Sequence, residues 1–341
     1  MTSSVASTRL RGTDDVGWRL LAALLVTALL AGCASSGSTS GPSTAEPKPV
    51  AAGRCDGVTR SEVKGREPGY GPHTMRSYPV AAAVCAAYWV DGLDDWFIPQ
   101  SIELIGSRVL VAGYQRKSPR LGNHPCQLLE LDPKTGRTVG FLARWEAPVY
   151  SSEPTFCRHS GGMEADDSGL WLVESNRLWL LDPDHLFDGD PVRRVWTLPP
   201  NVKGSALVID GSRMGIGRFR IDRSARMAWF SIPEILATSG ELPDPLRWRP
   251  VPRRLQGIAT GPGGIWFTST GTHCAELHTS EGRRLSFVPG AEDVEFVGRS
   301  IWTVSEAGAR YFLDPDEETI PAVLRLDRDA VLAGAEQHCP W

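Results

Sequence analysis

A group of acidic and polar side chains stands at the borders of short apolar segments between residues 159 and 306. Carboxylate and amide oxygens are the ligands that Ca²⁺ prefers, and a bound cation would polarise a carbonyl group and lower the pKa of a water molecule. In that chemistry, His159 or Glu164 would be the general base. The candidate residues are His159, Glu164, Glu174, Gln256, Glu292, Asp293 and Glu306.

The elements that would position these residues are repeated along the chain. Each repeat begins with a short apolar segment, which is followed by a turn and by a second segment, and repeats of this kind decide a fold. Clear copies of the first segment begin at Gly161, Gln256 and Glu292, and weaker copies begin at Gln100 and Ser205. The matching second segments are residues 169–174, 264–269, 300–306, 109–112 and 214–217.

Two further segments complete most of the repeats. A third segment ends in a polar turn, at residues 127–133, 178–183, 275–278 and 323–327, and a fourth covers residues 138–142, 193–198, 246–251 and 284–288. The segments are short, rich in Val, Ile, Leu and Trp, and separated by Gly or Asp-Pro turns, as strands are. Four antiparallel strands per repeat, at intervals of roughly 35–60 residues, predict an all-β fold, a β-propeller of four-stranded blades.

The last repeat lacks an outer strand, because residues 330–341 read as a short helix and a tail. A closed ring cannot leave such an edge bare, so we expect residues 85–90 to supply the missing strand. This gives five blades. The N-terminal segment, residues 55–97, is long enough to hold a sixth, degenerate blade, which stays open as the alternative.

In such a ring, the beginning of each inner strand lies nearest the mouth of the central channel, where the candidate residues would gather. A metal cage usually takes three or more ligands from separate blades. The residues at this position are Gln100, Gly161, Gly204, Gln256 and Glu292. Because they are not alike, we favour a plain interpretation, in which polar residues solvate the channel and cap the strand ends.

For two other groups of residues we predict a structural role and no role in binding or catalysis. Glu276 and His278 share one face of a third strand, and we expect an exposed polar face there. Trp171, Trp266 and Trp302 recur at one position of the repeats, which favours a place in the core between blades over a sugar-binding platform.

The segment Gly-Pro-Gly-Gly at 261–264, followed by Ile265-Trp266-Phe267-Thr268, resembles the repeats of streptogramin-lyase-like propellers. It is also similar to the wider group that holds NHL repeats and the SMP-30/gluconolactonase proteins. The resemblance covers residues 98–330 and implies a central channel with a ligand site at one mouth. The group includes metal-dependent lactonases, lyases and pure binding domains, so the fold alone does not choose a function.

The N-terminus has the order of an export signal. Arg9, Arg11 and Arg19 precede an uncharged apolar run at residues 20–30, which is too short to cross about 30 Å of hydrocarbon. Leu30-Ala31-Gly32-Cys33 follows and resembles a bacterial lipobox, which implies cleavage before Cys33 and lipidation of that cysteine with palmitate-type acyl chains.

The predicted organisation follows from these segments. Residues 1–32 are a lipoprotein signal peptide, 33–54 a lipid-anchored flexible tether, 55–97 an N-terminal segment with the closing strand, 98–330 the propeller and 331–341 a tail. We expect a protein on the extracytoplasmic face of the cell membrane.

Six cysteines remain after Cys33, an even number that predicts three disulfides in an exported chain. Six cysteines allow fifteen pairings, among which the sequence does not decide. Proximity along the chain favours Cys55–Cys85 and Cys126–Cys157, which leaves Cys274–Cys339.

The net charge and the repeat pattern together limit the classes of function that we expect. The chain has a net charge of −4, and loss of the leader, with three arginines and two aspartates, makes it slightly more acidic. An acidic surface argues against a nucleic-acid partner. We predict a monomeric binding or scaffold module for an envelope partner or a small ligand, without a cofactor. The alternative is a metal-assisted hydrolase or lyase, for which Ca²⁺ would be the cofactor.

Overall fold

A computed structural model describes residues 55–71, 74–117, 124–150, 153–279, 281–313 and 318–341. The predicted signal peptide, Cys33 and the predicted tether all lie outside these residues. The described residues belong to one compact unit, which begins at Pro47. Among them, no helix is both long and apolar enough to span a membrane.

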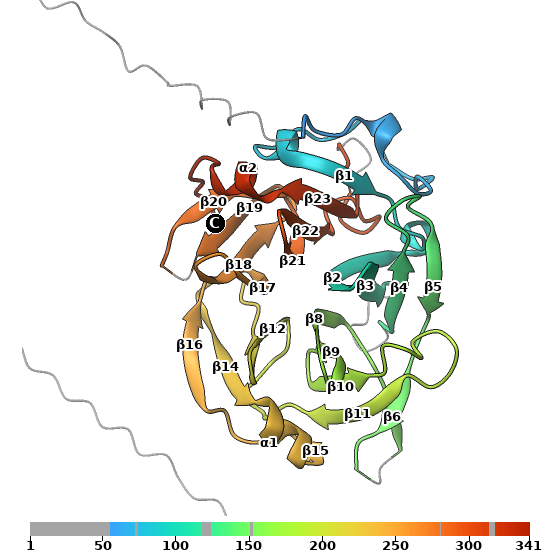
Figure 1. Ribbon diagram of the computed structural model, residues 1–341, viewed down its shortest axis with the longest axis vertical. Coiled ribbons are helices and arrows are strands. Elements are labelled where there is room, and N and C mark those ends of the chain that lie inside the picture. The colour runs from blue at the N-terminus through green and yellow to red at the C-terminus, as the bar shows by residue number, and fades with distance from the viewer. Residues whose placement is uncertain (1–54, 72–73, 118–123, 151–152, 280, 314–317) are drawn as a thin grey trace, which may run out of the picture. The chain divides into compact units, whose positions relative to one another are not determined.

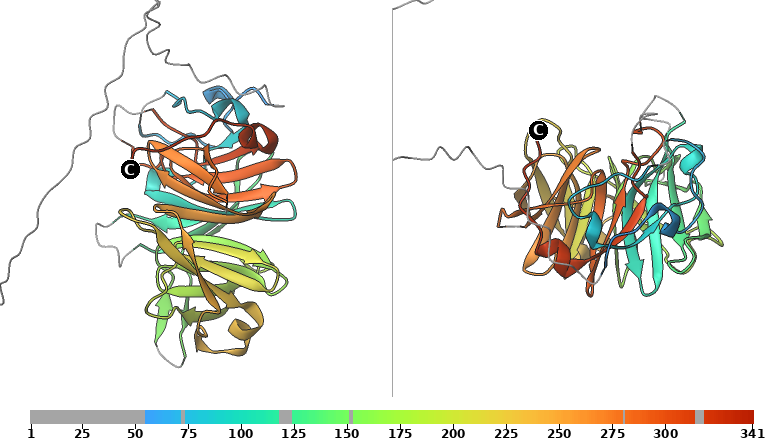
Figure 2. Two further views of the ribbon diagram at one scale, coloured as in Figure 1. Left: turned by 90° about the vertical axis from the view of Figure 1, so that its left-hand side faces the viewer. Right: turned by 90° about the horizontal axis from the view of Figure 1, so that it is seen from above.

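The compact unit is a ring of five antiparallel sheets, which confirms the predicted propeller (Figure 1). Blade 1 consists of β2 (Phe97–Ile105), β3 (Arg108–Gln115), β4 (Cys126–Leu131) and β5 (Thr138–Leu142). Blade 2 consists of β8 (Ser160–Asp166), β9 (Gly169–Glu174), β10 (Arg177–Leu181) and β11 (Val192–Thr197). Blade 3 consists of β12 (Ala206–Asp210), β13 (Arg213–Gly217), β14 (Ala225–Ser231) and β16 (Arg247–Val251). Blade 4 consists of β17 (Leu255–Gly261), β18 (Gly264–Gly271), β19 (Cys274–Thr279) and β20 (Arg284–Ser286). In the side views of Figure 2 the strands run between the two faces of the ring.

Blade 5 closes the ring with a strand from the other end of the described chain. It consists of β21 (Ala291–Val297), β22 (Ser300–Ser305), β23 (Val323–Asp327) and, outermost, β1 (Val84–Tyr88). β1 pairs antiparallel with β23, so the edge that the last repeat leaves bare is covered. The predicted closing strand is confirmed, and the count is five blades rather than six.

The hydrophobic core lies between the blades. Each pair of neighbouring blades encloses one cluster of buried side chains, so the ring has five such clusters among its described residues. Trp171 lies in the cluster between blades 2 and 3, Trp266 between blades 4 and 5, and Trp302 between blades 5 and 1. All three are at most 6% exposed, which confirms their predicted place in the core.

Several elements are additions to the blades that the sequence pattern does not predict. A hairpin of β6 (Glu146–Pro148) and β7 (Pro154–Phe156) follows blade 1. Helix α1 (Ile232–Ala237) interrupts blade 3 and leads to β15 (Gly240–Glu241), which pairs in parallel with β11 of blade 2. The remaining helices are the 3-10 turns η1 (Arg60–Glu62), η2 (Ala81–Ala83) and η3 (Leu93–Asp95), and α2 (Arg328–Leu332) in the expected C-terminal position.

The three favoured disulfides all form. Cys55–Cys85 joins the N-terminal segment to the closing strand, and Cys126–Cys157 joins blade 1 to the chain that enters blade 2. Cys274–Cys339 fastens the C-terminal tail to blade 4. Two of the three crosslinks therefore hold the segments at the ends of the described chain against the ring.

Candidate functional site

The channel of the propeller is ringed by the five innermost strands β2, β8, β12, β17 and β21 (Figure 1). Each of these strands contacts its two neighbours in the ring, and β21 meets β2 where the ring closes. Residues at one position of the repeat therefore form a layer around the channel.

One such layer holds a set of carboxylates that our comparison of the repeats missed. Glu103, Glu164 and Glu295 pair directly with Leu110, Trp171 and Trp302 of the next strands, so they occupy the same position in blades 1, 2 and 5. Our expectation that the repeats carry no similar acids at equivalent positions was wrong. It compared only the first residue of each inner segment, whereas the shared glutamates stand at the fourth.

The three glutamates come together in the structure. One carboxylate oxygen from each lies within 4.8 Å of the other two. Glu103 is 8% exposed, whereas Glu164 and Glu295 are half-buried. Oε1 of Glu103 accepts a hydrogen bond of 3.0 Å from the amide of Leu104, and its Oε2 is buried without a hydrogen-bond partner. Oε1 of Glu295 is likewise buried and unpartnered.

Burial and mutual repulsion disfavour the charged form of this layer. Burial raises the pKa of Glu103 to about 8. The pKa values of Glu164 and Glu295 lie well above the usual range, because their carboxyl groups are withdrawn from water and because other carboxylates, including Asp293, repel a further negative charge. Without a counter-ion, the layer therefore holds protons at neutral pH.

Asp293, which was predicted at the channel mouth, bridges two blades. Its carboxylate accepts hydrogen bonds from the amides of Ile102, at 3.2 Å, and Val294, at 3.0 Å. It is 1% exposed, and burial raises its pKa despite these two donors. Its first role is thus to join β21 to β2.

A second carboxylate pair lies near the beginnings of the inner strands. Glu292 and Glu306 are hydrogen-bonded to each other, and Nε2 of Gln100 donates to Oε2 of Glu306 at 3.1 Å. Burial raises the pKa of Glu306 to about 7 and that of Glu292 well above its usual range, with the neighbouring Glu306 adding to the latter. Gln256 also hydrogen-bonds Glu292. The structure thus brings together three of the predicted candidates, and the pair shares a proton.

His159 lies in an aromatic stack. The centroid of its ring is 4.2 Å from that of Tyr114, and the ring of His124 lies 5.3 Å from Tyr114 and 6.4 Å from His159. Burial, with repulsion from His124 and Arg116, lowers the pKa of His159 to about 4, so the imidazole is neutral at neutral pH. His159 is not among the side chains that meet Glu164 in the three-glutamate layer.

Glu174 is engaged in an ion pair. It contacts Arg177 and accepts a hydrogen bond of 2.7 Å from the amide of Arg158. Glu174 is 1% exposed, and burial raises its pKa while Arg177 opposes that shift. This carboxylate therefore has a basic partner within the protein.

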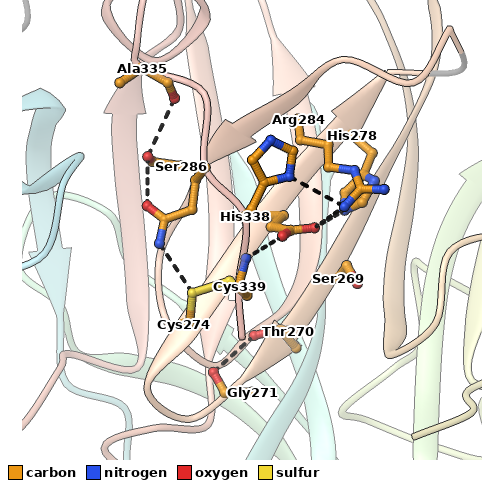
Figure 3. The surroundings of a disulfide bond; sticks show 12 residues. Ser269, Thr270, Gly271, Cys274, His278, Arg284, Ser286, Ala335, His338 and Cys339 are labelled. Carbon is orange, nitrogen blue, oxygen red and sulfur yellow. Dashed lines mark hydrogen bonds and ion pairs between the residues drawn. A yellow bond between two sulfur atoms is a disulfide. The ribbon is translucent and has the colours of Figure 1, made fainter. Parts of the chain in front are cut away.

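The expectation of an exposed polar face at Glu276 and His278 was wrong. Glu276 is 1% exposed and His278 is 8% exposed, because the C-terminal tail lies over this part of blade 4 (Figure 3). Oε1 of Glu276 accepts a hydrogen bond of 2.5 Å from the amide of Cys339, and its Oε2 lies 2.8 Å from Nε2 of His278. The pair fastens the tail beside its disulfide.

The outer side of blade 2 carries a pocket of about 530 Å³, between β6, β11 and the turn from α1 to β15. Arg194 and Trp196 donate to the carbonyl groups of Leu236 and Thr238, which fixes the turn on β11. The ring of Tyr150 lies against Gly240, where a Cβ atom would fall 1.9 Å from a ring atom. Tyr150 is nevertheless 63% exposed.

No protein-family model and no curated protein matches the chain. Among solved structures, BamB from Moraxella catarrhalis is 14% identical, with a TM-score of 0.29, over 77% of this chain and 61% of that one. A regucalcin from Agrobacterium tumefaciens is 12% identical, with a TM-score of 0.34, over 67% of this chain and 89% of that one. A luciferin-regenerating enzyme is 8% identical, with a TM-score of 0.36, over 71% and 92%. At these values the likeness supports no conclusion about the role of this chain.

Proposed function

We propose that this chain is a lipid-anchored extracytoplasmic protein whose propeller binds an envelope partner with its outer rim. The anchor is inferred from the basic, apolar and small residues that precede Cys33. The three disulfides support export, since such bonds persist in oxidising compartments.

The proposed binding role rests on the elements added to the outer rim of the ring between blades 1 and 3. The hairpin β6–β7, helix α1 and strand β15 are not needed to close the ring, yet together with β11 they build the pocket. A second pocket of about 620 Å³ shares Glu146 and Asp190 with it. Val139 and Phe141 on the neighbouring β5 are 63% and 50% exposed. Exposed apolar side chains beside a pocket are typical of protein-binding surfaces.

The catalytic alternative has weaker support. A metal-assisted hydrolase of the expected kind would bring carboxylates and a histidine together at one mouth. The carboxylates that meet are Glu103, Glu164 and Glu295, and His159 packs instead on Tyr114. A binding role therefore fits the described residues better than hydrolysis.

The anchor is tested by Cys33→Ser in the producing bacterium. We expect the wild-type protein to take up labelled palmitate and to sediment with membranes, and the variant to lose both properties. Retention of label and membrane association by the variant would refute the anchor.

The rim is tested by photo-crosslinking in intact cells. A photoreactive amino acid at Tyr150 or Phe141 should give the same envelope-protein adduct, whereas one at Ile221, which is 58% exposed elsewhere on the ring, should not. Adducts from all three positions alike, or from none, would contradict the proposed binding surface.

A further inference from the structure

The three-glutamate layer has the geometry of a cation site. We propose that Glu103, Glu164 and Glu295 bind one Ca²⁺ ion at the inner edge of blades 5, 1 and 2. Ca²⁺ binds oxygen ligands at about 2.3–2.6 Å, so two ligands on opposite sides of the ion are about 5 Å apart. The carboxylate oxygens here all lie within 4.8 Å of one another, which is close enough for the three to bind the same ion.

The layer also contains oxygen atoms that no protein group satisfies. Oε2 of Glu103 is buried without a partner, although Oε1 of the same carboxylate is held by the amide of Leu104. Oε1 of Glu295 is in the same condition. Buried polar atoms nearly always have a partner, so two open carboxylate oxygens in one cluster indicate a missing ligand that is positive or donates hydrogen bonds.

The surrounding charges favour a cation over a proton donor from the protein. The neighbouring charges that act on Glu164 and Glu295 are all carboxylates. Glu103 and Asp293 act on both, Asp166 also acts on Glu164, and Glu164 also acts on Glu295. A divalent ion would offset this repulsion in one step. Glu174 differs from these residues, because Arg177 neutralises its charge.

The fold itself does not require acids at this position. In blades 3 and 4 the equivalent residues are Val208, opposite Gly215, and Ala259, opposite Trp266. Both are fully buried in the hydrophobic clusters between blades. An aliphatic side chain therefore satisfies the packing, and the three glutamates must be explained by something that they bind.

The donor set selects the ion. All three protein ligands are carboxylates, without a histidine or cysteine in the group, and hard oxygen donors suit Ca²⁺ better than Zn²⁺. Ca²⁺ accepts irregular geometry with water in the remaining positions, whereas Mg²⁺ requires a near-ideal octahedron. Ligands that come from three separate strands meet the looser requirement.

The test uses the full-length protein in detergent, freed of metal by a chelator. Isothermal titration calorimetry with CaCl₂ at pH 7.5 measures affinity and stoichiometry. Tb³⁺, which accepts the same ligands as Ca²⁺, gives a second signal, because Trp171 and Trp302 stand opposite Glu164 and Glu295 and should sensitise its luminescence.

Glu103→Gln and Glu295→Gln keep the size of the side chain and remove its charge. We expect one Ca²⁺ per wild-type chain and a loss of affinity of at least about 10–100-fold in either variant, as loss of even a supporting residue costs that much at metal sites. Glu292→Gln, on the same strand but in the proton-sharing pair, is the matched control and should bind as the wild type does.

Three results would overturn the proposal. They are the absence of Ca²⁺ binding and Tb³⁺ luminescence in a folded wild-type protein, unchanged binding in both Glu103→Gln and Glu295→Gln, and loss of binding in the Glu292→Gln control. Tighter binding of Mg²⁺ or Zn²⁺ than of Ca²⁺ by the wild type would refute the assignment of the ion. Circular dichroism establishes that each variant is folded.

Discussion

The fourth position of the inner segments holds two different kinds of side chain around the ring. In blades 3 and 4 it holds Val208 and Ala259, which are buried in the hydrophobic clusters between blades. In blades 5, 1 and 2 it holds Glu295, Glu103 and Glu164, whose carboxylates crowd together with raised pKa values. The first arrangement serves stability. The second opposes it unless a ligand is bound, which is the mark of a site that folding alone does not explain.

The largest loss of stability is expected when a buried carboxylate that already has a basic partner is removed. Glu174→Ala removes the partner of Arg177 and the acceptor of the Arg158 amide. Breaking a buried ion pair costs about 3–5 kcal/mol, and the partial exposure of Arg177 places the expected loss of unfolding free energy near the lower end. Chemical denaturation measures it. A change within error would mean that partnered and unpartnered carboxylates do not differ here.

Substitutions in the three-glutamate layer are expected to raise the stability of the protein instead of lowering it. Glu103→Val combined with Glu295→Val makes blades 1 and 5 like blade 3, where Val208 fits. Replacing buried charged groups by hydrophobic ones commonly stabilises by about 1–4 kcal/mol, so the melting temperature of the metal-free protein should rise by several degrees at pH 8. A lower melting temperature in the double variant would contradict this prediction, since the glutamates would then contribute to folding.

A smaller change in stability is expected when the pH is raised. The pKa of Glu103 is raised to about 8 and that of Glu306 to about 7, so the folded protein holds protons that the unfolded chain has already lost near pH 4.5. Stability should therefore fall as pH rises from 6.5 to about 8, by up to about 1.4 kcal/mol per pH unit for each proton held. This window lies above the titration of His159, whose lowered pKa acts in the opposite direction.

Thermal unfolding in chelator at pH 6.5, 7.2 and 8 measures this slope. Ca²⁺ should stabilise more at pH 8 than at pH 6.5, because it replaces protons in the layer. The Glu103→Val, Glu295→Val double variant should show a shallower slope than the wild type. Equal slopes would assign the pH dependence to the Glu292–Glu306 pair instead.

The candidate site was partly accessible from the repeat alone. Glu164 was among the candidates, but Glu103 and Glu295 were not, although the three stand at one repeat position. Aligning every position of the inner segments would have found them. The partners of Glu174 and the stacking of His159 could not be found this way, because Arg177 and Tyr114 reach them through strand ends and loops whose course is not periodic.

The amino-acid sequence alone was enough to predict the ring, because short apolar segments with regular turns specify strands and a missing outer strand requires a closing one. For the disulfides, proximity along the chain favoured the three pairings that form but did not exclude the others. The features of the ring follow from local pattern and from the need to cover a sheet edge. Tertiary structure alone decided which polar groups are buried. Glu276 and His278 lie under a tail that is distant in sequence, and three glutamates meet only because β21, β2 and β8 are neighbours in the closed ring. Burial and charge depend on what packs against a residue from other parts of the chain, and a pattern along one strand does not contain that information.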